Sequence, residues 1–130
     1  MSYTTYQTDA NVFIHKDSVD LLFLVLKATP AFGYASQTAV DNAAHIEALF
    51  REYGWSVRFD EWGNIKSMWA QNEGSPETEE RFLQLIAPYM HRGSYIEMRG
   101  EDDAWWRWVF KGGKCHEVLP TVTWPTMEDL

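Results

Sequence analysis

The chain has 130 residues, 45 % of them hydrophobic, including seven Trp, seven Phe and six Tyr. That length suits one domain, and so much apolar and aromatic side chain provides a core and argues against disorder. The formal net charge of −8 disfavours nucleic-acid binding, which needs basic patches; it suits either plain solubility or steering towards a basic partner.

The cysteine content and the hydropathy of the chain indicate the cellular compartment that suits this protein. The single cysteine, Cys115, excludes an internal disulfide and is typical of a reducing cytoplasm. The opening residues lack the basic start and apolar run of a secretory signal. The longest apolar stretch, residues 19–28, is far shorter than the roughly 20 residues that cross a bilayer. We therefore expect a cytoplasmic protein without a membrane segment: a single domain over residues 1–125 and a short flexible acidic tail over residues 126–130.

The first third of the chain predicts a strand and a helix. Residues 3–14 are rich in Thr, Tyr, Val and Phe and predict a strand, clearest from Val12 to Ile14. The helix that follows is capped by Asp17 or Ser18 and stopped by Pro30. Its apolar residues wrap most of the way round, so we expect it to be covered on most sides.

The next segments predict a second helix and a hairpin. The helix runs from about Thr38 to Tyr53 and ends at Gly54. Residues 55–69 predict a hairpin with a three-residue loop, in which Gly63 takes a positive φ. This loop sets three facing pairs, which are Phe59 with Ile65, Val57 with Ser67, and Trp55 with Trp69.

A third helix is expected after the hairpin. Ser75 caps it and Pro76 takes its first position. Acidic residues follow in the first turn, where the helix dipole favours negative charge. Pro88 lacks an N–H, so the helix kinks or ends near Ala87. Its buried stripe consists of Phe82, Leu85, Ile86 and Tyr89.

Three strands then form a meander, at about residues 94–99, 104–110 and 114–119. With three-residue loops at both turns, Met98 and Val118 face Trp106, and Ile96 and His116 face Trp108, so both tryptophans lie on the core face. Arg107 lies between Glu97 and Glu117 on the other face. A two-residue Gly112-Gly113 loop would instead bring Glu117 against Trp108. Residues 122–124 could add a short edge strand. The fold class is thus α+β, with three helices packed on antiparallel sheet, a central hairpin and a C-terminal meander.

The stretch GEDDAWWRWVF, residues 100–110, supplies the candidate binding site. In the preferred register Trp105 points outward beside Glu101, Asp102 and Asp103. Acids steer a basic protein partner and an exposed Trp anchors it, so these four residues predict a protein-binding surface. The alternative is a solvated turn with Trp105 covered by the tail around Trp124.

Catalytic and metal-binding patterns are missing from the sequence. The glycines are isolated or turn-like, and one cysteine cannot provide zinc-ligand spacing. Cys115 and His116 are neighbours on a strand and point to opposite faces, so they cannot pair as nucleophile and base. The Glu101–Asp103 run lacks the further ligands of a calcium loop. We therefore expect no enzyme, no catalytic residue, no cofactor and no metal.

The last third, GSYIEMRGEDDAWWRWVFKGGKCHEV, resembles small acidic proteins of phages and mobile elements. The shared features are a Gly-Glu-Asp turn followed by Trp-Arg and an aromatic strand, within residues 93–124. The resemblance implies a role in binding and blocking a host factor, as inhibitors of bacterial immunity do, and it implies no catalytic residue.

Two functions follow as hypotheses. The first is a small acidic protein-binding module that docks on another macromolecule, with a flat or convex acidic face. The second is a small-ligand-binding protein or enzyme that uses the aromatic sheet face as a pocket wall, which would require a deep cavity holding His116 and acids. The sequence indicates no particular oligomeric state.

Overall fold

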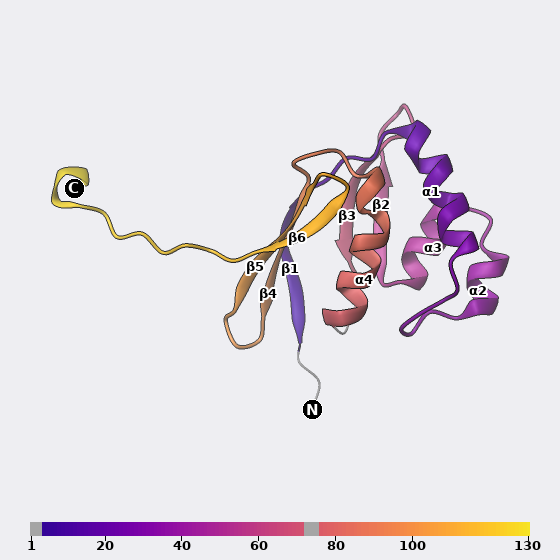
Figure 1. The fold of residues 1–130 in the computed structure, drawn as a ribbon, viewed down its shortest axis with the longest axis horizontal. Helices are drawn as coiled ribbons and strands as arrows, with labels where there is room; N and C mark the ends of the chain where they lie inside the picture. The colour runs from indigo at the N-terminus through magenta and orange to yellow at the C-terminus, as the bar shows by residue number, and fades with distance from the viewer. Residues whose placement is uncertain (1–3, 72–75) are drawn as a thin grey trace.

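The computed structural model describes residues 4–71 and 76–130 and has an α+β fold with two antiparallel sheets (Figure 1). The larger sheet has the strand order β1-β4-β5-β6, and β2 and β3 form a separate hairpin. The strands are β1 (Thr5–Asn11), β2 (Trp55–Phe59), β3 (Ile65–Ala70), β4 (Tyr95–Gly100), β5 (Trp105–Lys111) and β6 (Lys114–Val118). The helices are α1 (Lys16–Ala28), α2 (Gln37–Asn42), α3 (Ile46–Glu52) and α4 (Pro76–Ile86), with short 3-10 turns η1 (Ala87–Tyr89) and η2 (Met127–Asp129). The α+β class, the hairpin and the meander are as expected, but the described ranges hold four α-helices rather than three.

The first strand and the first helix differ from expectation in detail. β1 ends at Asn11, and Ile14 forms only an isolated bridge to Ile65. His15, not Asp17 or Ser18, caps α1, because its Nδ1 accepts a hydrogen bond from the backbone N–H of Asp17 at 3.2 Å. Helix α1 therefore begins at Lys16, two or three residues earlier than a cap at Asp17 or Ser18 would place its first residue.

Helix α1 is covered on one face only. Val19, Leu22 and Leu26 are buried, whereas Leu21 and Leu24 are exposed. The expectation of burial on most sides is wrong, because α1 lies at one end of the molecule and packs mainly towards α3 and η1 (Figure 1).

The helix expected from Thr38 to Tyr53 is broken into α2 and α3. Ala43 is extended, and the break lies beside Lys27 of α1. Lys27 Nζ donates hydrogen bonds to the carbonyls of Val40, Asp41 and Ala43. In a continuous helix those carbonyls would accept from residues four positions further on. A cation from another helix thus satisfies the end of α2, and the chain turns before it starts α3.

The β2–β3 hairpin has the expected loop but a shifted ladder. Phe59 faces Ile65 and Gly63 has φ 88°, as predicted. A bulge between Arg58 and Phe59 then moves the pairing by one residue, so that Trp55 faces Ala70 instead of Trp69. A one-residue slip exchanges the faces of a strand; here Trp55 is buried while Trp69 remains partly exposed.

The meander confirms the first predicted turn and corrects the second. Met98 faces Trp106 and Ile96 faces Trp108 across β4 and β5. Between β5 and β6, however, the loop has two residues, Gly112 (φ 64°) and Gly113 (φ 74°). Two successive positive φ angles form a type I′ turn, whose twist matches that of the strands.

The shorter loop changes which β6 residues face β5. Glu117 lies opposite Trp108, Val118 opposite Arg107 and His116 opposite Val109. The predicted placements of Val118 against Trp106, His116 against Trp108 and Glu117 against Arg107 are therefore wrong. Trp106 and Trp108 are nonetheless buried, as expected.

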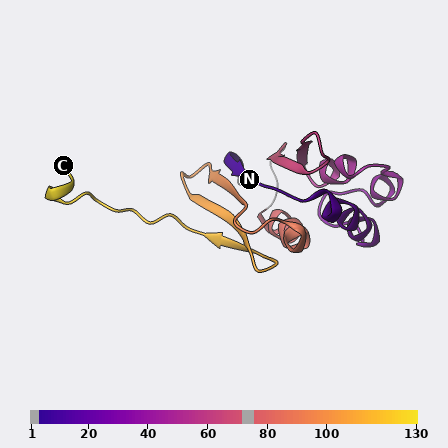
Figure 2. The same ribbon diagram turned by 90° about the horizontal axis from the view of Figure 1, so that it is seen from above.

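Helix α4 packs between the larger sheet and the region of α3. It starts at Pro76 and gives way to η1 at Ala87, next to Pro88, as predicted; the expected cap, Ser75, lies outside the described residues. On one side Phe82 packs on the rings of Phe50 and Tyr53, at centroid distances of 5.2 and 4.9 Å. Seen from above, α4 lies between the larger sheet and the α1–α3 region (Figure 2).

After β6 the chain leaves the domain. Residues 119–130, which we call the arm, run away from the sheet in both views (Figures 1 and 2), and their side chains are exposed. The expected edge strand at residues 122–124 does not form within this one chain. No helix in the described ranges is long and apolar enough to cross a membrane.

Candidate functional site

The acidic turn between β4 and β5 uses two of its three carboxylates to hold its own shape. Asp102 Oδ1 accepts a hydrogen bond from the N–H of Ala104 at 3.2 Å. Asp103 adopts φ 64° and forms an ion pair with Arg99. Glu101 is tied by its backbone N–H to the Thr4 carbonyl at 2.9 Å, and its side chain is exposed. Of the three acids, Glu101 is thus the one with no such role in the turn.

Trp105 points to the outer face of the sheet, as the sequence predicts. It faces Arg99 across the ladder, and the guanidinium carbon lies 4.9 Å from the indole centroid, so the two form a cation–π pair. The indole remains 39 % exposed. Trp124 does not cover it, since Trp124 is itself 84 % exposed.

A groove of about 490 Å³ opens beside Trp105, where β6 passes into the arm. Its walls come from β5 on one side and from the end of β6 and the arm on the other. The lining residues are Glu97, Trp105, Trp106, Arg107, Val118, Leu119, Pro120 and Val122. The lining is mainly apolar. The volume of the groove falls within the range of about 300–1,000 Å³ typical of ligand sites.

Pro120 explains why the groove opens at this point. The β5–β6 ladder ends at the pair of Arg107 and Val118. Two residues further on, Pro120 would come opposite Trp105, and proline has no N–H to donate to the ladder. The arm therefore separates from β5 and leaves the end of that strand uncovered.

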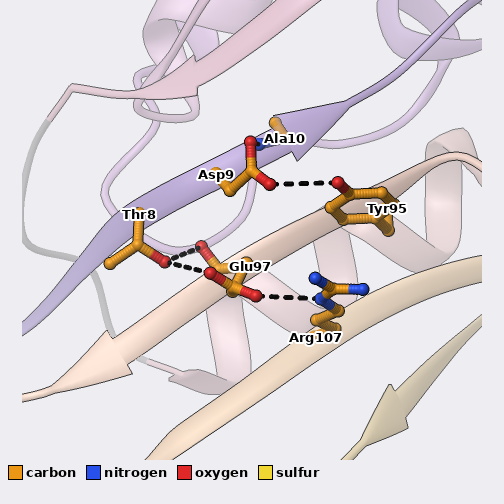
Figure 3. A network of polar contacts seen from close by, with 6 residues as sticks. All are labelled: Thr8, Asp9, Ala10, Tyr95, Glu97 and Arg107. Carbon is orange, nitrogen blue, oxygen red and sulfur yellow. Dashed lines mark hydrogen bonds and ion pairs between the residues drawn. The ribbon is translucent and has the colours of Figure 1, made fainter.

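The polar side chains next to the groove are paired with one another (Figure 3). Glu97 accepts hydrogen bonds from Arg107 Nε at 2.9 Å and from Thr8 Oγ1 at 2.8 Å. Tyr95 donates its hydroxyl proton to Asp9 at 3.0 Å, and this hydrogen bond raises the pKa of Tyr95. Arg107 also lies over the Tyr95 ring, 4.3 Å from its centroid. These contacts connect β1, β4 and β5 next to the groove.

One buried polar atom at the groove lacks a partner. Trp106 lines the groove, is only 9 % exposed, and its indole N–H makes no hydrogen bond within the described ranges. A buried donor without a partner costs about 1–3 kcal/mol. The Trp106 side chain lies on the inner face of the sheet, opposite Met98, so this donor belongs to the core and not to the outer surface.

Cys115 and His116, the two neighbouring residues with reactive side chains on β6, do not form a pair. Burial, together with the charges of Glu80 and Glu79, raises the pKa of Cys115 to about 12. His116 points to the opposite face of β6, and its Nε2 lies 3.1 Å from the Lys111 carbonyl. His116 does not line the groove. In the described part of the chain, no three His, Cys, Asp or Glu side chains are grouped to hold a metal ion.

The arm supplies groove residues that the sequence analysis did not include in the site. From β6 onward every second residue is apolar, namely Val118, Pro120, Val122 and Trp124. Such alternation is the sequence signal of a strand with one covered face. Only the last part of this segment, residues 122–124, is predicted from the sequence as an edge strand.

No family model, curated protein or solved structure matches the chain. Its function is therefore inferred from the geometry of the groove, the turn and the arm.

Proposed function

We propose that this protein is a small acidic protein-binding module, and that its partner docks on the outer face of the larger sheet. The groove beside Trp105 is the observation that carries the proposal. It offers an apolar wall and a partly exposed indole. Tryptophan is enriched among the residues that dominate binding energy.

The charge of the molecule favours a basic partner. The net charge is −8, and Glu101 extends into solvent at the turn that precedes Trp105. Like charges repel and opposite charges speed encounter, so a partner with basic residues around an apolar segment fits this surface best. Inhibition of a host factor, which the resemblance to phage proteins implies, is one biological setting for such binding.

The alternative, a small-ligand pocket or active site, has less support. It would need a deep cavity that holds His116 and acids. The groove is lined by one acid, Glu97, which is already bound to Thr8 and Arg107.

The experiment compares two partly exposed tryptophans. The full chain, Trp105→Ala and Trp62→Ala are used as baits in extracts of the native cell, and captured proteins are quantified by mass spectrometry. Trp62 is the matched control, because it is exposed on the loop between β2 and β3, away from the groove. We expect one captured protein to be lost with Trp105→Ala and retained with Trp62→Ala.

The captured protein is then purified and its binding is measured directly. Trp105→Ala should mainly speed dissociation, and a Lys substitution of the Glu101–Asp103 acids should slow association and flatten its salt dependence. If both folded variants bind like the parent, this face is not the binding surface.

A further inference from the structure

Within the described residues, the outer edge of β6 is hydrogen-bonded at one residue, Cys115, and has no neighbouring strand. The side-chain amide of Gln84, from α4, accepts a hydrogen bond from Cys115 N–H at 3.0 Å and donates one to the Cys115 carbonyl. A glutamine amide thus replaces the neighbouring strand at Cys115. Because backbone groups alternate sides along a strand, those of Glu117 point the same way as those of Cys115.

The arm continues this open edge. In an extended chain Leu119, Thr121 and Thr123 would present their N–H and C=O groups on the same side as Glu117. Pro120 does not interrupt that side, since its missing N–H belongs to the side that faces β5. Pro125 does interrupt it, because it occupies one of the alternate positions whose N–H would point outward, away from β5. The open edge is therefore bounded by Cys115 and Pro125.

These two limits are symmetric about Pro120, since each is five residues away from it. A strand with this property can pair antiparallel with an identical strand across a two-fold axis at Pro120. In that register Glu117 faces Thr123 of the second copy, and Leu119 faces Thr121. No two like charges face each other in this ladder.

The side chains of the segment also fit a paired strand. Valine and threonine have high β propensity, and the segment contains Val118, Val122, Thr121 and Thr123. In an extended chain one face would carry the apolar residues Val118, Pro120, Val122 and Trp124. Within the described residues of the single chain, residues 119–124 have no strand beside them, and Val122 and Trp124 are 78 % and 84 % exposed. An unpaired edge of this kind is a template for another strand.

We propose that residues 116–124 pair with the same residues of a second copy, so that the two four-stranded sheets become one continuous sheet. The two-fold axis passes at Pro120, and the apolar stripes of the two arms join on the outer face. This dimer does not depend on the proposed partner binding. It would leave the groove open on that face and present two such grooves together.

The first test uses sedimentation of the full chain over a concentration series. We expect a monomer–dimer equilibrium, which higher salt shifts towards dimer because each copy carries a charge of −8. Thr121→Pro removes an outward N–H and should raise the dissociation constant at least about tenfold. Thr121→Ala keeps that N–H and should leave the constant nearly unchanged. Both changes lie in the exposed arm, so the domain keeps its fold.

The second test fixes the register. Directly opposed Cβ atoms in such a ladder are about 4.5–5.5 Å apart, within reach of a disulfide. Under mild oxidation Pro120→Cys should form a covalent dimer, and Thr123→Cys, which faces Glu117 of the second copy, should not. The buried Cys115 thiol does not compete.

Three results would overturn the proposal. They are a chain that stays monomeric at every concentration, a dimer that Thr121→Pro leaves intact, and equal cross-linking through residues 120 and 123. The variant Thr121→Pro also separates the two proposals. If it no longer forms a dimer but still captures the partner, the dimer interface is distinct from the binding surface around Trp105.

Discussion

Trp108 on β5 donates its indole N–H to Glu79 Oε2 on α4, at 3.0 Å. This contact holds the first turn of α4 against the inner face of the larger sheet. Burial raises the pKa of Glu79 from about 4.5 to about 7, even though the hydrogen bond from Trp108 favours the ionised form. Glu79 is therefore a titrating group inside a structural contact.

The raised pKa predicts how stability changes with pH. The folded state binds the Glu79 proton more tightly than the unfolded state does. The stabilising contribution of Glu79 to the free energy of unfolding is thus fully present below about pH 4.5 and is lost as pH rises to about 7. We expect this loss to be about 2 kcal/mol, after allowance for the partial exposure of the group. Glu79→Gln should remove it, which urea unfolding at pH 5 and pH 8 would measure.

Glu77→Gln is the control for that measurement, because Glu77 lies in the same turn and is exposed. It should leave the pH dependence as in the parent. Equal pH dependence of the parent and Glu79→Gln would mean that Glu79 is ionised in the fold at pH 5.

Trp108 and Trp105 provide a test of the meander register. Trp108 is 3 % exposed and Trp105 is 39 % exposed, although both are on β5. Trp108→Ala should destabilise the protein by about 3–5 kcal/mol, as large-to-small core changes do. Trp105→Ala should cost about 1 kcal/mol, mainly through the lost contact with Arg99. Similar losses in chemical unfolding of the two variants would contradict the assignment of faces.

The turn between β5 and β6 depends on backbone conformation alone. Gly112 has φ 64°, and a Cβ added there would meet nothing within 4 Å. Gly112→Val should therefore lower the free energy of unfolding by about 1–2 kcal/mol through its left-handed backbone. Gly112→Asn should cost much less, since asparagine tolerates that conformation. Thermal melting of the two variants tests this, and equal melting temperatures would argue against the two-residue turn.

Cys115 should be chemically silent in the folded protein. Its buried thiol has a pKa of about 12, so almost none is thiolate at neutral pH. We expect a thiol reagent such as Ellman's reagent to react slowly in buffer and fully in denaturant. Cys115→Ser should leave partner binding within a few-fold. Rapid labelling of the native protein would show that β6 opens or that α4 leaves it.

Local signals in the sequence determined much of the fold. The positive-φ glycines, Pro76 and Pro88 act within a few residues, and so they mark where turns form and where α4 begins and ends. Alternation in residues 94–110 likewise predicted which face of β5 is buried and that Trp105 points outward. It also put Glu101, Asp102 and Asp103 in a turn beside Trp105.

Tertiary contacts decided the rest, because the groups involved lie far apart in the chain. The carbonyls of Val40, Asp41 and Ala43 bind Lys27, which ends a helix that local pattern alone would continue. The groove beside Trp105 depends on where β6 stops pairing with β5, and β6 ends at the pair of Arg107 and Val118. Likewise, Gln84 blocks the edge of β6 at Cys115, 31 positions further along the chain, through contacts that only the packing of α4 on the sheet creates.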